Sequence, residues 1–385
     1  MQYIAKTMAG LEPVLQNELQ ALGAENIIIL KRAVSFEGDL ALLYRANYEL
    51  RTALRILQPI AQFEVRDEHD LYKRVKSINW SDYMGHQNTL AIDAVVSSQY
   101  FNHTNYVALK SKDAIVDQFR EKFGRRPDVD VNNPDVRINI HIGKTTCSVS
   151  LDSSGDSLHK RKYRVMSTLA PINEVLAAGM VQLSEWTFDR NFIDPMCGSG
   201  TIIIEAAMLA YNIPPQVLRK EFAFMKWPDF DRNLWRNIKS DARKNQRDFA
   251  YKIIGFDKSV EALKACRENL REINLQEQVK VAEADFKTAT PLPEKGILMM
   301  NPPYDERLEE DDIKALYGEI GTRMKHFYAG YEAWIISANF DALKNVGLRP
   351  SKKIQLFNGP LPCKFQKYEM YEGSKKGKKS DEVKL

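Results

Sequence analysis

The chain has 385 residues, 44% of them hydrophobic, and a formal net charge of +4. This length predicts roughly two or three globular domains, and the lack of an 18-residue apolar run argues against a membrane span. The N-terminus does not resemble a signal or transit peptide. The four cysteines form no C-x-x-C pair, which argues against a zinc site or a disulfide framework. We therefore expect a protein of the reducing cytoplasm with no bound metal.

The first 65 residues predict the order strand, helix, strand, strand, helix, strand, which is typical of a ferredoxin-like domain. Gly23 follows the first predicted helix and suits its C-cap. The predicted elements are 2–8, 12–22, 26–30, 33–37, 39–49 and 53–62.

Residues 66–155 predict a second α+β domain with no catalytic group of residues, so we expect it to hold a substrate or to be structural. Its clearest signals are a strand at 90–96, an amphipathic helix at 111–119, and alternating strands at 136–142 and 146–151.

A linker is expected at 156–168, next to the turn-forming stretch 152–157. It carries a dense basic cluster, which suits the phosphates of a nucleic acid. The residues predicted to make these contacts are Lys160, Arg161, Lys162 and Arg164.

Residues 169–372 alternate strands with helices, which predicts a parallel, doubly wound α/β domain. Its first strand ends in the motif D-P-x-x-G-S-G-T, and a helical pattern follows. Gly198 and Gly200 allow a sharp turn and the close approach of a ligand, and the helix N-terminus offers free N–H groups. The spacing is that of neither a P-loop nor a dinucleotide-binding motif. Asp194 before the glycines suits an amino-acid ammonium group, which indicates S-adenosylmethionine.

Two further acids follow later strands of this predicted domain. Asp257 ends a strand at 253–257 and suits the ribose hydroxyls, while Asp285 follows a strand from 279 and suits the adenine amine. An alternative for Asp257 is the N-cap of the next helix. The predicted donor-binding residues are Asp194, Cys197, Gly198, Gly200, Thr201, Asp257, Lys258, Asp285 and Phe286.

The segment 211–250 separates Asp257 from the glycine turn by more than the ~20 residues usual in nucleotide-binding folds. It holds nine basic and five acidic residues among interleaved aromatics. Such a segment suits unpaired bases and phosphates, but the aromatics equally suit a helix packed inward, and we favour that interpretation for them.

Asn301-Pro302-Pro303-Tyr304 follows the apolar strand 296–300. The Asn301 oxygen and the Pro302 carbonyl can accept both N–H bonds of an exocyclic base amine, which aims its lone pair at a methyl donor. Tyr304 offers a face on which an extruded base can stack. The alternative is a rigid turn. The catalytic prediction is Asn301, Pro302 and Tyr304, and residues 373–385 predict a disordered basic tail.

These motifs together resemble the THUMP-domain RNA methyltransferases, nearest the bacterial 23S rRNA guanine-N2 branch, whose members are often labelled N6-adenine-specific DNA methylases. The resemblance covers nearly the whole chain and includes 112–117, 124–127, 150–155 and 158–164, besides the two motifs of the α/β domain. The stretches 357–359 and 361–363 resemble the C-terminal end of the family, although we derive no role for them. Asp305 stands where relatives often carry Gly.

The resemblance implies a ferredoxin-like domain at 1–65, a THUMP RNA-binding domain at 66–155 and a Rossmann-like methyltransferase domain at 169–372. It implies S-adenosylmethionine as cofactor, 23S rRNA or a ribosomal precursor as partner, and RNA as the ligand of the basic cluster. The alternatives are a tRNA guanine-N2 methyltransferase, a DNA adenine-N6 methyltransferase and a non-catalytic RNA-binding assembly factor.

Overall fold

The computed structural model describes residues 1–167, 171–291, 293–303 and 310–371. The chain forms two compact units, each assembled from three stretches of sequence. The first unit comprises Met1–Thr7, Leu15–Lys160 and Arg219–Lys244, and the second comprises Met8–Val14, Arg161–Leu218 and Asn245–Leu385. In the described part of the chain, no helix has the length and apolar character needed to cross a membrane.

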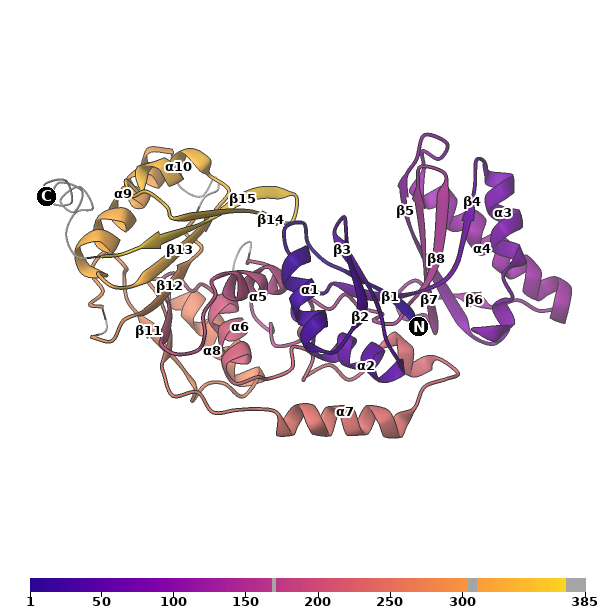
Figure 1. The fold of residues 1–385 in the computed structure, drawn as a ribbon, viewed down its shortest axis with the longest axis horizontal. Helices are drawn as coiled ribbons and strands as arrows, with labels where there is room; N and C mark the ends of the chain where they lie inside the picture. Colours follow the sequence, from indigo (N-terminus) through magenta and orange to yellow (C-terminus); the bar gives the residue numbers. More distant parts are fainter. Residues whose placement is uncertain (168–170, 292, 304–309, 372–385) are drawn as a thin grey trace, which may run out of the picture. The chain divides into compact units, whose positions relative to one another are not determined.

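The first unit is built on one eight-stranded sheet, shown in the indigo to magenta part of the chain (Figure 1). Strand β4 (Arg55–Glu64) pairs antiparallel with β1 on one side and with β8 on the other, so the two predicted N-terminal domains share a continuous sheet. The strand order is β2-β3-β1-β4-β8-β7-β5-β6. The other strands are β1 (Gln2–Lys6), β2 (Glu25–Leu30), β3 (Ala33–Glu37), β5 (Thr89–Ser97), β6 (Asp128–Val129), β7 (Val136–Gly143) and β8 (Thr146–Asp152).

The helices and strands predicted for residues 1–155 form with shifts of a few residues, except that the helix predicted at 111–119 is much longer. Its N-terminal part, from Thr104, holds polar residues that weaken the apolar period from which the prediction was made. The helices are α1 (Glu12–Ala21), α2 (Leu40–Glu49), α3 (Glu68–Ser77) and α4 (Thr104–Phe123), with a 3₁₀ turn η1 (Trp80–Asp82).

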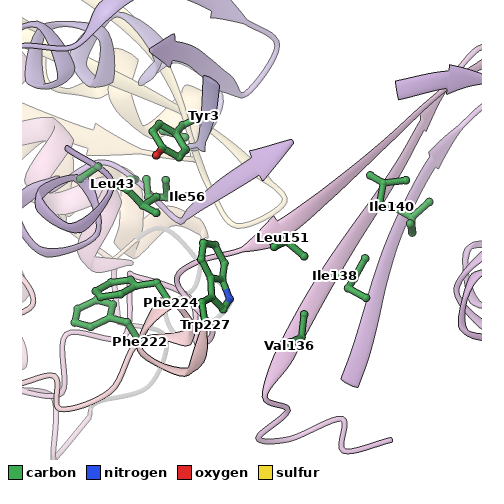
Figure 2. Packing of buried hydrophobic residues seen from close by; sticks show 14 of the residues in the cluster. Tyr3, Leu43, Ile56, Val136, Ile138, Ile140, Leu151, Phe222, Phe224 and Trp227 are labelled. Carbon is green, nitrogen blue, oxygen red and sulfur yellow. The ribbon is translucent and has the colours of Figure 1, made fainter. Parts of the chain in front are cut away.

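The aromatic residues between Phe222 and Trp235 belong to the core of the first unit or pack against it (Figure 2). The rings of Phe224 and Tyr44 stack with centroids 4.4 Å apart, and Trp235 meets Tyr48 edge-on at 5.3 Å. Burial of one such ring stabilises the fold by roughly 1.5–3 kcal/mol. The inward-packing interpretation is confirmed for Phe222, Phe224, Trp227 and Trp235, all at most 6% exposed.

The basic character of this segment lies on the other face of its helix, α7 (Arg232–Lys244), which follows η2 (Ala223–Lys226). The buried residues Trp235, Ile238 and Ala242 recur at helical spacing along one side of α7. Although Arg219–Lys244 lies within the predicted methyltransferase domain in sequence, it packs in the first unit. Its apolar residues find their partners there, which sequence order alone does not reveal.

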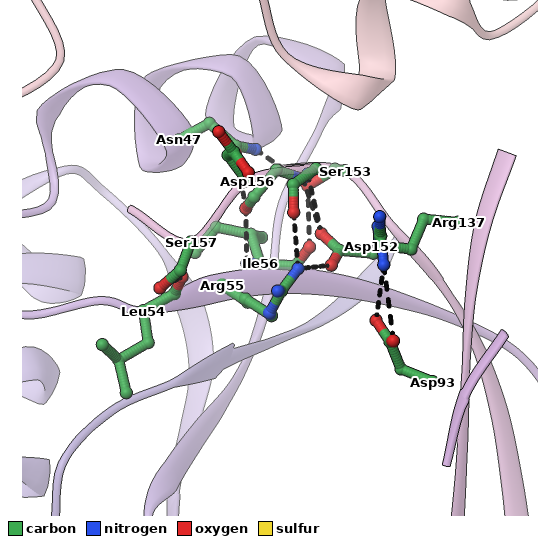
Figure 3. A network of polar contacts seen from close by, with 12 residues as sticks. Asn47, Leu54, Arg55, Ile56, Asp93, Arg137, Asp152, Ser153, Asp156 and Ser157 are labelled. Carbon is green, nitrogen blue, oxygen red and sulfur yellow. Dashed lines mark hydrogen bonds and ion pairs between the residues drawn. The ribbon is translucent and has the colours of Figure 1, made fainter. Parts of the chain in front are cut away.

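A buried polar network holds the end of β8 and the turn-forming stretch after it (Figure 3). Asp152, 1% exposed, forms an ion pair with Arg55 and accepts hydrogen bonds from the N–H groups of Ser154 and Gly155 at 2.8 and 3.1 Å. The Asn47 amide donates to the Ser153 hydroxyl at 2.8 Å. The Ser157 hydroxyl and the Leu158 N–H both donate to the Leu54 carbonyl, at 3.2 and 2.8 Å, so the start of the predicted linker is also fixed to the first unit.

The second unit is an α/β fold with a seven-stranded sheet of order β11-β10-β9-β12-β13-β15-β14, drawn in rose to yellow (Figure 1). The first five strands in this order, β11, β10, β9, β12 and β13, are parallel. Strand β15 runs antiparallel to both of its neighbours, β13 and β14. The strands are β9 (Asn191–Asp194), β10 (Ile253–Asp257), β11 (Val279–Glu283), β12 (Gly296–Met300), β13 (Glu332–Ser337), β14 (Lys352–Asn358) and β15 (Leu361–Glu369). This is the predicted Rossmann-like architecture.

Every residue of β9 and β12 is buried, as expected for central strands covered on both faces. The covering helices are α5 (Glu174–Leu183), α6 (Thr201–Ala210), α8 (Val260–Glu272), α9 (Glu310–Phe327) and α10 (Phe340–Asn345). Ligands of open parallel sheets bind beyond the carboxyl ends of the central strands. Those ends lie at Asp194, Asp257 and Met300.

Candidate active site

A cavity of about 440 Å³ lies beyond the carboxyl ends of β9, β10 and β12, entirely within the second unit. This volume is in the range of small-molecule and cofactor sites. The described residues that line it are Pro171, Ile172, Asp194, Pro195, Met196, Cys197, Gly198, Ser199, Thr201, Ile202, Asp257, Lys258, Ser259, Ala262, Ala284, Asp285, Phe286, Lys287, Asn301, Pro302, Pro303, Leu316, Asn358 and Leu361. The structure thus brings the predicted donor residues other than Gly200 to one cavity, together with Asn301 and Pro302.

The glycine turn between β9 and α6 depends on left-handed backbone at both glycines, with φ of +53° at Gly198 and +87° at Gly200. The Gly198 N–H donates to the carboxylate of Asp257 at 2.9 Å, which fixes the turn against the end of β10. Gly200 is not among the described lining residues, and a Cβ there would lie 2.5 Å from the Cys266 sulfur. Its role is therefore close packing of the turn on α8.

Asp194 ends β9 as a buried carboxyl, 1% exposed. It accepts a hydrogen bond from the Met196 N–H at 3.1 Å. Burial raises the pKa of Asp194 to about 8. The hydrogen bond from Met196 lowers this pKa, and the nearby Asp257 carboxylate raises it. A cationic group bound in the cavity would favour the ionised form. The site is therefore suited to a ligand that carries an ammonium group.

Asp257 is held by two backbone donors, because Gly198 N–H and Ser259 N–H each reach one carboxylate oxygen at 2.9 Å. Each oxygen keeps a lone pair for a ligand hydroxyl. The alternative that Asp257 caps α8 is wrong, since Ser259 is the N-cap and accepts from the Ala262 N–H at 3.2 Å. Asp285, half-buried after β11, accepts from the Lys287 N–H at 2.9 Å.

Among the other predicted donor residues, Cys197, Thr201 and Phe286 form the apolar and neutral part of this wall. The Cys197 thiol is 6% exposed, and its hydrogen bond with Cys266 together with burial raises its pKa well above the ordinary value, so it is neutral. Phe286 is 2% exposed, Thr201 begins α6, and Lys258 is exposed at the rim.

Asn301 follows the buried strand β12 at the point where the chain leaves the sheet. Its Oδ1 atom is buried and has no hydrogen-bond partner among the described residues. Buried acceptors are seldom left without a donor, and a functional role is one of the usual reasons. Pro302 is buried beside it and Pro303 also lines the cavity. Tyr304, the third predicted catalytic residue, lies outside the described residues.

The structure corrects the predicted RNA contact of Arg161. Its side chain is 0% exposed and forms an ion pair with the equally buried Glu205, with Nε and Oε1 3.5 Å apart. A guanidinium with no exposed surface does not reach a phosphate. Lys160 and Lys162 on either side are exposed, so successive side chains of the cluster point alternately to solvent and to the interior. The charge pattern alone does not reveal this alternation.

Arg164 is also engaged within the protein, with 16% of its side chain exposed. It donates to Glu174 at 2.8 Å, to the Ile172 carbonyl at 2.9 Å and to the Thr201 hydroxyl at 3.1 Å. Ile172 and Thr201 line the cavity, so Arg164 supports the wall of that cavity. This is a second departure from the predicted phosphate contact.

Sequence reasoning missed two lining residues far along the chain, Asn358 and Leu361. They face each other across the two-residue turn between β14 and β15. Their stretch was noted in the sequence only as a resemblance, since no chemical pattern indicates that this hairpin returns to the carboxyl edge of the sheet.

Family models match the chain in three consecutive parts. They are the RlmL ferredoxin-like domain over residues 2–57, the THUMP domain over 65–152, and the RMKL-like methyltransferase domain over 161–367.

Two curated relatives and one solved structure illustrate the similarity. A Synechocystis protein whose name marks it as a candidate RNA methyltransferase is 37% identical over 96% of this chain and 97% of its own. The ribosomal RNA large subunit methyltransferase K/L of Syntrophotalea carbinolica is 35% identical over 97% of this chain, which spans 54% of that protein's length. The crystal structure of SMU.472, described as a candidate methyltransferase complexed with SAH, is 30% identical with a TM-score of 0.87, covering 97% of this chain and 99% of that one.

The residues of the cavity fit S-adenosylmethionine. A buried carboxyl at Asp194 suits the ammonium group, the lone pairs of Asp257 suit two hydroxyls, and the left-handed backbone at Gly198 turns the chain where it lines the cavity. The methyltransferase family model matches more than half of the chain, and the two relatives match over nearly its whole length. The chain belongs to the RMKL-like family of S-adenosylmethionine-dependent methyltransferases, with a ferredoxin-like domain and a THUMP domain before the methyltransferase domain.

Proposed function

We propose that this protein methylates the exocyclic N2 amine of a guanosine in 23S rRNA. The observation that carries the proposal is the buried Oδ1 of Asn301, an acceptor without a partner among the described residues, in the same cavity as Asp194 and Asp257. An exocyclic amine supplies the missing donor. Its binding there places a nucleophile next to the donor-binding residues.

The choice of substrate class rests on the domains that precede the methyltransferase. A THUMP domain matches residues 65–152, and relatives 35–36% identical are named ribosomal RNA large subunit methyltransferases. This chain spans 54% of their length, so their substrate comes to it as part of the proposal. The exposed Lys160 and Lys162 add cations suited to RNA phosphate.

The donor-binding side orients the methyl group. Asp194 accepts from the ammonium group, Asp257 from the ribose hydroxyls and Asp285 from the adenine amine, while the turn at Gly198 lets the backbone approach closely. When bound, S-adenosylmethionine supplies an electrophilic methyl carbon on a positively charged sulfur. The acids therefore hold three separate groups of one ligand and fix the direction in which that methyl group points.

The base-binding side makes a poor nucleophile competent. The N2 lone pair of guanine is delocalised into the ring, and the Asn301 oxygen with the Pro302 carbonyl accepts the two N–H bonds so that the lone pair faces the methyl carbon. The new bond joins N2 to that carbon, the carbon–sulfur bond breaks, and its electron pair stays on sulfur. One N2 proton then leaves to solvent, so no strong base is required. Positioning supplies most of the rate enhancement.

The decisive experiment offers labelled S-adenosylmethionine with deproteinised 23S rRNA, tRNA and duplex DNA in parallel reactions, followed by nucleoside analysis. N2-methylguanosine in 23S rRNA is the expected product. The same nucleoside in tRNA would move the enzyme to that substrate, and N6-methyladenine in DNA would overturn the assignment of guanine. No transfer to any of the three would contradict methylation of free 23S rRNA, and assembling ribosomal particles would be tested next.

A further inference from the structure

The hairpin formed by β14 and β15 reaches the base side of the cavity. In the sheet order, β11, β10 and β9 carry the donor-binding residues, β12 carries Asn301, and β13, β15 and β14 continue on the far side of β12. The last pair between β13 and β15 joins Ser337 to Lys364, so the residues before Lys364 extend past the carboxyl end of β13. The hairpin turn therefore projects from the edge of the sheet where the cavity lies.

Asn358 and Leu361 are the two residues of this hairpin that line the cavity. They are direct cross-strand partners at its end. Because alternate residues of a strand face the same side, Asn358 shares a face with the fully buried Leu356, and Leu361 shares one with the fully buried Cys363. Both side chains therefore lie on the inner face of the hairpin, at its tip, where Asn358 is partly buried and Leu361 is 48% exposed.

The turn between them is rigid. Only Gly359 and Pro360 separate the two strands. Gly359 has φ of +62°, which the first position of a tight hairpin turn requires, and the ring of Pro360 fixes the next φ. The Asn358 N–H also reaches the buried Cys363 sulfur. A side chain on such a turn keeps its position when a ligand enters, as a residue that reads a base must.

From this placement we propose that Asn358 is the residue that recognises the target base, pairing with the O6 and N1–H groups of the guanine whose N2 amine is held by Asn301. The proposal rests on the proposed function. A primary amide carries a donor and an acceptor side by side. Its N–H group matches the O6 acceptor and its oxygen matches the N1–H donor, and these two groups lie next to N2 on the Watson–Crick edge. Leu361 supplies an apolar contact at the mouth of the same pocket.

The test uses the full chain and 23S rRNA in which the mapped target nucleotide is either guanosine or 2-aminopurine, introduced by ligation. Both bases carry the N2 amine, but 2-aminopurine lacks O6 and the N1 proton, so an amide makes one hydrogen bond with it in place of two. Asn358→Ala is expected to lower kcat/KM for guanosine about 5- to 150-fold, the range for one bidentate base contact. It should lower the rate on 2-aminopurine by less, so the ratio between the two bases falls.

Gln355→Ala is the matched control, because it removes an amide from the exposed part of the same strand, outside the described lining of the cavity. This variant should keep the wild-type ratio, and both variants should bind S-adenosylmethionine with unchanged affinity by calorimetry. Equal losses on the two bases, or no loss on either, would overturn the assignment of Asn358. Failure of the wild-type enzyme to methylate N2 of guanosine would instead overturn the proposed function, and is seen before any variant is made.

Discussion

The two sides of the cavity satisfy their polar groups in opposite ways. On the donor side, the carboxyl groups of Asp194, Asp257 and Asp285 all accept hydrogen bonds from backbone N–H groups. On the base side, the buried oxygen of Asn301 has no partner among the described residues. Leaving such an acceptor unpaired costs about 1–3 kcal/mol. The donor-side carboxyl groups thus have backbone partners before a ligand arrives, whereas under the proposed function the substrate amine supplies the partner of Asn301.

The largest expected effect comes from Asn301→Ala. If the substrate amine completes this acceptor, its removal should lower kcat by about 100-fold or more, since misplaced reacting groups cost that much. Affinity for S-adenosylmethionine should stay unchanged by calorimetry, and the melting temperature should not fall, because the Oδ1 atom of Asn301 accepts no hydrogen bond from the described residues. Asn301→Asp keeps an acceptor and should retain more activity than the alanine variant. Wild-type turnover in Asn301→Ala would contradict the proposal that the substrate amine donates to the Asn301 oxygen.

A smaller effect is expected for Asp257→Ala. This variant should lose affinity for S-adenosylmethionine, whereas Asn301→Ala should lose turnover. Loss of the two ribose contacts and of the bond to the Gly198 N–H should weaken S-adenosylmethionine binding by at least roughly 10- to 100-fold, which is the effect of losing one hydrogen bond to a charged group, at about 1.5–3 kcal/mol. Calorimetry measures this directly. Asp241→Ala, the same charge change on α7 outside the described cavity lining, is the control. Unchanged affinity in Asp257→Ala would show that the ribose assignment is wrong.

The pH dependence of donor binding sharpens the account of Asp194. Its pKa of about 8 means that the carboxyl is largely protonated in the free protein below that pH. A ligand ammonium group favours the ionised form, so binding releases a proton and affinity should rise toward pH 8, by up to about tenfold per unit. In the free protein the raised pKa also means that stability falls as pH rises from about 4 to 8. Asp194→Asn should flatten both profiles, and an unchanged slope of affinity in that variant would contradict the assignment.

The smallest effect is expected outside the cavity, at Lys160 and Lys162. Reversing both charges should weaken RNA binding a few-fold, and the dependence of log affinity on log salt should lose about one unit of slope for each phosphate contact removed. Lys344→Glu, an equal change per residue at an exposed position on α10, is the control. If Lys344→Glu weakened RNA binding as much per reversed charge, Lys160 and Lys162 would contribute only through the net charge of the protein.

Much of the second unit follows from local sequence. The strand that ends at Asp194, the glycine turn and the strand that ends at Met300 were each indicated by an apolar run followed by a polar or glycine signal. Parallel topology then brings their carboxyl ends together. This is why eight of the nine predicted donor residues lie around one cavity, the exception being Gly200.

What the sequence does not reveal is which side chains of a mixed segment turn inward. Arg161 and Lys162 are neighbours of equal charge, yet one is buried against Glu205 and the other is exposed. Asn358 carries no local signal because its position depends on the path of a hairpin after the last parallel strand. Both cases depend on contacts with residues distant in the sequence. A local pattern of charge or hydropathy does not identify those residues.

The assignment of Met8–Val14 to the second unit and of Arg219–Lys244 to the first has a consequence for dissection of the molecule. Each unit contains a stretch that lies, in the sequence, between two stretches of the other unit. Cutting the chain near residue 160 therefore yields neither unit whole. A fragment beginning at Arg161 would lack Leu11, which packs against Gly179, and would expose the aromatic side chains around Trp235. We expect such a fragment to aggregate, and the two units to complete their folding together.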